Sequence, residues 1–290
     1  MAVTYRRARP GQELRANDAM VMTIIDGGWP DQPVPAIHRR WFEPTTAPAE
    51  GRMPLVLLHE GLGSISAWGR FPQALADASG RRLLAFDRPG YGLSGQRPGP
   101  WPATFMHHEA AELPALLQAE GVERPILVGH SDGATISLLY PSQTGPDAPA
   151  PAGIVSLSAH VMVEALNVAA ITELRRTYAD ELAPRLARHH RNADETFANW
   201  SDVWVSDRFR PWAIHAELAA IECPVLVVQG EADGYGTWRQ VDELVASLAA
   251  PHETVGLPEV DHWPHREAPD DVLRLVREFA DAVDPITPPA

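Results

Sequence analysis

The segment Arg124–Tyr140 constrains the fold of this chain more than any other stretch. It opens with the apolar run Ile126–Val128, continues with the pentapeptide 129–133 (GHSDG), and ends in a run compatible with a helix. A strand, a tight turn and a helix in this order hold the serine of the turn in a strained backbone conformation, with its hydroxyl clear of the chain. The pentapeptide alone also fits an ordinary glycine-containing turn. Ser131 is therefore a candidate nucleophile only if an acid, a base and oxyanion donors accompany it.

Composition narrows the class of protein. Of the 290 residues, 45% are hydrophobic and 21% are charged, which is typical of a globular protein with a sizeable core. The net charge of −14 argues against nucleic acid or an anionic membrane as a partner. The chain has no lysine, which excludes a Schiff-base lysine or a Ser-Lys dyad, and its one cysteine, Cys223, excludes an intrachain disulfide.

The first residues contain no apolar segment typical of a signal peptide, and no apolar run approaches the ~18 residues of a membrane span. We therefore expect a soluble, cytoplasmic protein whose partner is a small-molecule substrate. A homodimer is compatible with the sequence.

Short apolar runs alternate with helical patterns along most of the chain, which predicts an α/β protein with a mostly parallel sheet and helices on both faces. From His160 to about Leu218 this alternation stops and only helical patterns remain. We therefore expect a core domain made of residues 1–159 and 219–290, with a helical cap at 160–218. The expected strands are 19–25, 36–42, 55–58, 81–86, 126–128, 154–157, 224–229 and 253–257. The expected helices are 71–79, 107–121, 134–140, 165–186 with a break near Pro184, 189–200, 202–212, 237–250 and 269–283.

An acid and a base follow the serine in the order that its turn requires. Asp233 comes directly after an apolar strand, at the edge where sites gather in parallel sheets, and Glu231 is the alternative carboxylate. His262 lies in the loop after the last expected strand, where it can act as general base, and His265 is the alternative. The order serine, acid, histidine is the one expected for a nucleophile on a strand-to-helix turn.

An oxyanion hole needs two backbone N–H groups aimed at the developing negative charge. The N–H of Asp132, at the start of the helix after the serine, is one candidate. The second is Gly61, or Leu62 as the next choice, in the glycine-rich loop after strand 55–58. Glu60 is unexpected there, because a carboxylate opposes negative charge. We expect its side chain to anchor the loop or to contact the substrate.

Together these motifs resemble those of the α/β-hydrolase superfamily, over nearly the whole chain and in particular its lid-bearing serine esterases. The resemblance implies an eight-stranded, mostly parallel sheet, a helical cap over the site, and no cofactor or metal. An aspartate in place of Ser131 would suggest a dehalogenase or an epoxide hydrolase, so the serine argues against both. Two positions depart from the family pattern, since Glu60 and Asp261 stand where glycine is usual. The matching motifs are 59–64 (HEGLGS), 87–94 (DRPGYGLS), 129–133 (GHSDG), 230–233 (GEAD) and 261–265 (DHWPH).

The cap supplies the candidate substrate contacts His160, Trp200, Trp204 and Trp212, and Glu60 joins them from the core. Aromatic side chains over a site can line an apolar pocket, although packing of the cap against the core is the alternative. The adjacent histidines 189 and 190 diverge by about 100° on a helix, so we interpret them as surface residues rather than metal ligands.

The sequence thus predicts a serine hydrolase that cleaves a carboxylic ester of a small to medium, apolar or aromatic substrate through an acyl-enzyme. A thioesterase, lactonase, amidase, C–C bond hydrolase or perhydrolase would use the same three residues. A ligand receptor that has kept this fold without catalysis is the alternative from another class.

Overall fold

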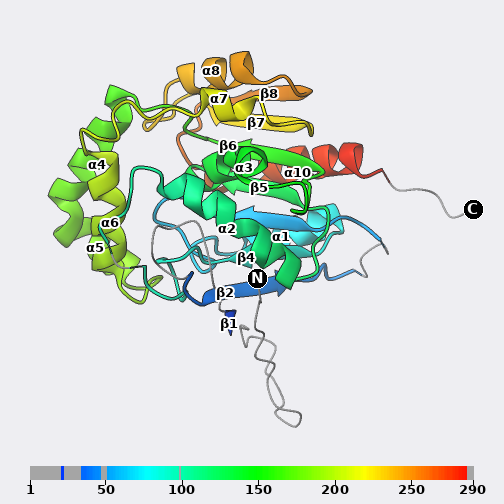
Figure 1. Ribbon diagram of the computed structural model, residues 1–290, viewed down its shortest axis with the longest axis horizontal. Helices are drawn as coiled ribbons and strands as arrows, with labels where there is room; N and C mark the ends of the chain where they lie inside the picture. Colours follow the sequence, from blue (N-terminus) through cyan, green and yellow to red (C-terminus); the bar gives the residue numbers. More distant parts are fainter. Residues whose placement is uncertain (1–20, 23–33, 47–50, 98, 286–290) are drawn as a thin grey trace, which may run out of the picture.

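Eight strands form one sheet at the centre of the protein, in the order β1-β2-β4-β3-β5-β6-β7-β8. The computed structural model describes residues 21–22, 34–46, 51–97 and 99–285 (Figure 1). β1 and β2 pair antiparallel to their neighbours, and the other strands are parallel. The expected α/β class and mostly parallel sheet are confirmed. The strands are β1 (Val21–Met22), β2 (Ile37–Phe42), β3 (Leu55–Leu58), β4 (Leu83–Phe86), β5 (Ile126–His130), β6 (Gly153–Leu157), β7 (Val225–Gly230) and β8 (His252–Leu257).

The central strands are apolar throughout because both faces of the sheet are covered. In β3, Leu55 and Leu57 point into one hydrophobic cluster, and Val56 and Leu58 point into another. Helices α1 and α10 cover the first face, and α2, α3, α7 and α8 cover the second (Figure 1). The helices are α1 (Phe71–Ser79), α2 (Phe105–Ala119), α3 (Asp132–Gln143), α4 (Ala165–Thr177), α5 (Ala183–Leu186), α6 (Ala193–Trp204), α7 (His215–Leu218), α8 (Arg239–Ser247), α9 (Pro264–Glu267) and α10 (Pro269–Val283).

Most expected elements of the core are confirmed to within a few residues, and α1, β3 and α10 have the predicted bounds. The expected strand at 19–25 is described only at Val21–Met22, and its other residues lie outside the described chain. Pro114 lies inside α2 without ending that helix. The four-residue helices α7 and α9 were not expected, because one helical turn is too short to show a hydrophobic period.

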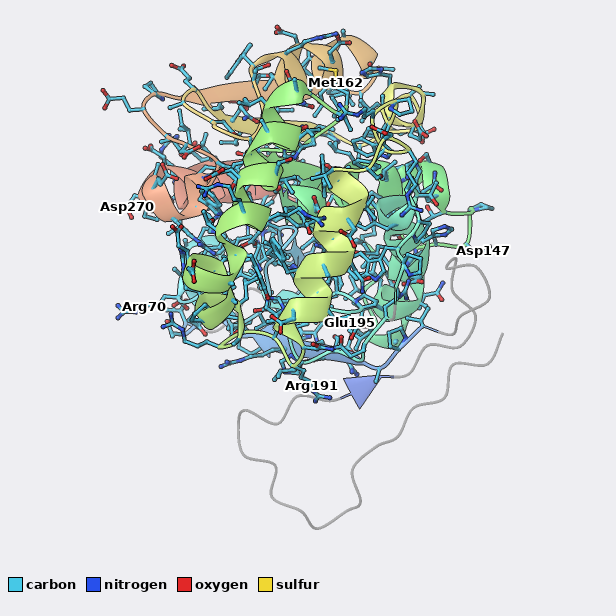
Figure 2. The ribbon with its side chains drawn as sticks, turned by 90° about the vertical axis from the view of Figure 1, so that its left-hand side faces the viewer. Arg70, Asp147, Met162, Arg191, Glu195 and Asp270 are labelled. Carbon is cyan, nitrogen blue, oxygen red and sulfur yellow. The ribbon has the colours of Figure 1, made fainter. Side chains whose placement is uncertain are left out.

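Between β6 and β7 the chain leaves the sheet and forms helices α4 to α7, which we call the cap segment (residues 160–218). Figure 2 shows α4 and α6 crossing one face of the molecule, from near Met162 to near Arg191 and Glu195. A single antiparallel bridge between Met162 and Ala213 joins the two ends of the segment.

The helices of the cap segment differ from the expected ones. The break placed near Pro184 is a π-helical turn, Tyr178–Leu182, just before that proline. The helices expected at 189–200 and 202–212 are instead one helix, α6, followed by turns. No helix among the described residues is both long enough and apolar enough to cross a membrane.

Candidate active site

Ser131 sits on a sharp turn between β5 and α3. Its φ of 52° and ψ of −119° lie outside the regions that most residues adopt. The positions two residues before and after the serine require glycine, because there is no room for a side chain. A Cβ on Gly129 would lie 2.3 Å from the carbonyl oxygen of Gly133, and one on Gly133 would lie 2.2 Å from that of Leu58. The turn therefore presents the Ser131 hydroxyl at the carboxyl end of the sheet, as the sequence predicts.

Ser131, His262 and Asp233 form one chain of hydrogen bonds. The Oγ of Ser131 lies 2.9 Å from Nε2 of His262, and Nδ1 of His262 lies 2.8 Å from Oδ2 of Asp233. Because a carboxylate only accepts, Nδ1 carries the proton of the neutral ring and Nε2 can accept one from the serine. All three side chains are at least nine-tenths buried. The three residues expected to act together are thus in contact.

Asp233 is fixed and kept ionised by its surroundings. Oδ1 accepts the backbone N–H groups of Tyr235 (2.7 Å) and Gly236 (3.0 Å), and Oδ2 accepts the side-chain amide of Gln229 (2.6 Å). Burial opposes ionisation, but His262 and the backbone donor at Tyr235 outweigh it and hold the pKa of Asp233 at about 2. The role of Gln229 was not predicted from the sequence, although a polar residue near the end of an apolar strand was a usable signal.

The alternative acid and base lie elsewhere. Glu231 is exposed and makes no hydrogen bond to His262 in the described part of the chain. His265 packs its ring against Trp68 (centroids 4.5 Å apart) and His130 (4.7 Å). His130, which sequence reasoning did not single out, donates from Nε2 to the carbonyl oxygen of His262 at 2.7 Å. This bond ties the histidine loop to the strand that carries the serine.

The candidate oxyanion donors lie beside the serine. Gly61, Leu62 and Asp132 line the same cavity as Ser131, and within the described residues their backbone N–H groups have no hydrogen-bond partner. The indole of Trp200 packs on Gly61, where a Cβ would lie 2.3 Å from Nε1. A side chain at position 61 would therefore displace Trp200. The geometry leaves Gly61 and Leu62 both available as second donor.

The carboxylate of Asp132 belongs to a buried polar network. Its Oδ2 accepts the indole N–H of Trp200 at 3.0 Å and lies 3.8 Å from Nη2 of Arg88, which also pairs with Glu109 at 2.6 Å. Burial raises the pKa of Asp132 to about 6, against the attraction of Arg88. Trp200 thus touches both candidate arms of the oxyanion hole, Gly61 by packing and Asp132 by a hydrogen bond.

The carboxylate of Glu60 faces two basic side chains, Arg266 and His130. Its Oε1 lies 3.3 Å from Nη2 of Arg266 and its Oε2 lies 3.6 Å from Nδ1 of His130. Burial opposes ionisation, but the neighbouring histidines and Arg266 hold the pKa of Glu60 well below its usual range. Of the two roles expected for Glu60, these contacts favour the anchor, and the residue also lines the cavity.

A cavity of about 270 Å³ opens over Ser131, between the core and the cap segment. Four of the five expected substrate contacts, Glu60, His160, Trp200 and Trp204, line it. The expectation for Trp212 is corrected, because this residue does not line the cavity and instead stacks on Phe209 with ring centroids 4.9 Å apart. The apolar cap residues of the wall, beside the two tryptophans, are Ile171, Leu174, Leu182 and Leu186.

His160 and His190 are both buried near the cavity. His160 lies 5.5 Å from the ring of His262, and burial first, then the charge of His262, lower the pKa of His160 to about 4. His190 is not a surface residue as expected, because it accepts the N–H of Gly92 (2.9 Å) and contacts the carbonyl of Leu62 (3.1 Å). Within the described ranges, no three His, Cys, Asp or Glu side chains are grouped to hold a metal ion.

Comparison with known proteins identifies the family. The model of the "Alpha/beta hydrolase family" matches residues 55–275, which is most of the chain. The chain belongs to the alpha/beta hydrolase family. This hydrolase is 25% identical over 245 residues to "Esterase YbfF" of Escherichia coli, covering 78% of its own length and 92% of the relative. It is 24% identical over 299 residues to "Epoxide hydrolase A" of Mycobacterium tuberculosis, with coverage of 78% and 90%.

The fold of this hydrolase is also similar to that of solved structures. A thermophilic esterase from Thermogutta terrifontis aligns with a TM-score of 0.66 over 92% of this chain and 100% of the other, at 16% identity. At that identity the likeness concerns the fold alone, so the reaction must be argued from the site.

Proposed function

We propose that this hydrolase cleaves carboxylic esters, with Ser131 as nucleophile, His262 as general base and Asp233 as the residue that orients His262. The observation that carries the proposal is the hydrogen-bonded chain of these three buried side chains beside a cavity between the core and the cap segment. A serine alcohol is a weak nucleophile until a positioned base accepts its proton, and the 2.9 Å contact with Nε2 supplies that base.

In the first step Ser131 Oγ bonds to the carbonyl carbon while its proton moves to Nε2 of His262. The N–H of Asp132, with that of Gly61 or Leu62, stabilises the negative oxygen of the tetrahedral intermediate. The C–O bond to the alcohol then breaks, and His262 returns the proton to the leaving oxygen. Water, activated by the same histidine, hydrolyses the acyl-enzyme and restores the serine. No other reactant is needed.

The largely apolar wall from the cap segment supports substrates of small to medium size with apolar parts. A thioesterase, lactonase, amidase or C–C bond hydrolase would share the same residues. A serine at this position also distinguishes the site from the aspartate that an epoxide hydrolase of this fold would need, despite the relative of that name.

The test is labelling with a fluorophosphonate, followed by steady-state hydrolysis of a panel of esters, thioesters, lactones and amides. We expect labelling at Ser131, turnover of carboxylic esters, and a loss of at least ~10³-fold in kcat/KM in Ser131→Ala with the fold retained. A fully active Ser131→Ala protein would overturn the mechanism. Labelling without any steady-state turnover would favour the non-catalytic receptor.

A further inference from the structure

Cations from both the cap segment and the core meet at the cavity. Arg185 of α5 and Arg266 of α9 line its wall, together with His189. Partial burial and the charges of three nearby arginines lower the pKa of the His189 imidazole, against the opposing charge of Glu60, so each of these charged side chains lies within electrostatic reach of His189. The three arginines are Arg188, Arg266 and Arg185.

The carboxylates of the cavity wall pair with cations other than Arg185. Glu60 pairs with Arg266 at 3.3 Å, and Asp132 faces Arg88 at 3.8 Å. The guanidinium of Arg185 makes no ion pair or hydrogen bond with any residue that the structure describes, including Glu181 four positions earlier. The side chain of Arg185 is exposed and lines the cavity, so its guanidinium can meet a ligand there.

The wall beside Arg185 is apolar. Leu182 and Leu186 flank the arginine in sequence, and Ile171 and Leu174 of α4 add to the same wall. A guanidinium presented at an apolar surface favours a ligand that is apolar along its length and anionic at its end. A carboxylate matches the planar donor fork of arginine.

We propose that the substrate is an ester that carries a free carboxylate, such as a half-ester of a dicarboxylic acid, and that Arg185 binds this carboxylate. The inference rests on the proposed ester hydrolysis and names its substrate class. The scissile carbonyl lies at Ser131, the apolar segment lies along the leucines of the cap, and the anionic end lies at Arg185.

The test compares substrates that differ only in charge. One pair places the charge on the acyl side: monoethyl adipate against the corresponding amide, ethyl 6-amino-6-oxohexanoate. The second pair places it on the alcohol side: 4-acetoxybenzoate against 4-acetoxybenzamide. We expect the carboxylate member of at least one pair to have a kcat/KM about threefold to tenfold higher at low ionic strength. Added salt should reduce this preference, because salt screens an exposed ion pair.

Two variants with the same change in charge locate the effect. Arg185→Gln should abolish the preference for the carboxylate and its salt dependence. Arg188→Gln removes an exposed arginine three positions along the chain, and this arginine does not line the cavity. The Arg188→Gln variant should therefore keep the preference for the carboxylate.

The outcomes separate this inference from the proposed function. Equal hydrolysis of acid and amide in both pairs, or a preference that survives in Arg185→Gln, would overturn the inference alone. Failure to hydrolyse any of the four compounds by a protein whose Ser131 reacts with fluorophosphonate would also reject this substrate class. Absence of both turnover and labelling would reject the proposed function, and the inference with it.

Discussion

At the scale of single residues, Asp132 has two distinct features. Its backbone N–H is a candidate oxyanion donor, and its carboxylate is buried. Its backbone N–H begins α3 beside the serine, while its carboxylate is 1% exposed and accepts the indole N–H of Trp200. Burial raises the pKa of this carboxylate from 3.8 to about 6, so its ionisation destabilises the folded state.

The substitution Asp132→Asn removes this ionisable carboxylate and so tests its effect on stability. Relative to the variant, the natural protein should be most stable below pH 3.8 and should lose stability as the pH rises through about 6. The rise in pKa corresponds to a relative loss of about 3 kcal/mol. Urea denaturation of both proteins at several pH values measures it. A difference in stability that does not change with pH would contradict the buried, partly protonated carboxylate.

A second residue-scale prediction separates the two candidate acids. Asp233→Asn should reduce kcat by about 10³- to 10⁴-fold, because an amide at that position can donate to Nδ1 and leave Nε2 protonated. Glu231→Gln is the matched control: Glu231 is exposed and makes no contact with His262, so kcat should change by less than about twofold. The reverse ranking would assign the acid to Glu231.

At the scale of elements, helix α6 contacts the candidate oxyanion donors through Trp200. Trp200 packs on Gly61 and donates to Asp132, so it links the cap segment to β3 and α3 at the same point. The position of α6 and the geometry of the candidate oxyanion donors are therefore coupled.

Trp200→Phe keeps the aromatic contact and removes the donor. We expect kcat to fall about tenfold with a smaller change in KM, because the backbone N–H of Asp132 is less well fixed once its carboxylate loses the hydrogen bond from Trp200. Stability should fall by about 1–3 kcal/mol, because a buried carboxylate loses a partner. The control is Trp212→Phe on the same segment, whose indole N–H has no partner among the described residues and which does not line the cavity. Equal effects of the two substitutions on kcat would show that general packing of the cap explains the result.

The elements of the core could be predicted because their signals are local. The run Leu55–Leu58 is apolar at every position, and the bounds of α10 follow from Pro269 and the amphipathic run behind it. In the cap segment the tryptophans pack on one another in several directions, so hydrophobic spacing does not mark where α6 ends. The contact of His130 with the histidine loop and the place of Arg185 on the cavity wall could not be predicted, because both depend on how distant parts of the chain come together rather than on a motif.

At the scale of the whole molecule, Arg81 joins the start of β4 to the end of α10. Its guanidinium is fully buried and contacts Asp284, the carbonyl oxygen of Ala280 (2.9 Å) and that of Met53 (3.1 Å). Arg81 thus bonds to Met53, which is 28 positions away in the sequence, and to Asp284, which is 203 positions away.

Arg81→Ala should destabilise the fold by about 2–4 kcal/mol, because it leaves the carbonyl oxygens of Ala280 and Met53 without their buried donor. The partly exposed carboxylate of Asp284 loses one partner but keeps the N–H of Met53. The neighbouring Arg82 pairs with Glu43 at the surface, where both side chains are 52% exposed, and Arg82→Ala should change stability by less than about 1 kcal/mol. Chemical denaturation of both variants at pH 7 measures the difference. Similar losses in the two variants would contradict the role of Arg81.

The bridge between Met162 and Ala213 has a consequence for how such a protein can diversify. The chain leaves the core before α4 and returns to it after α6 at adjacent backbone positions. The register between β6 and β7 therefore does not depend on the helices inserted between these two strands. Helices can be lengthened, shortened or exchanged by recombination at this one junction while the serine, the acid and the histidine stay in place. Evolution can then alter the choice of substrate on the cap side without disturbing the chemistry in the sheet.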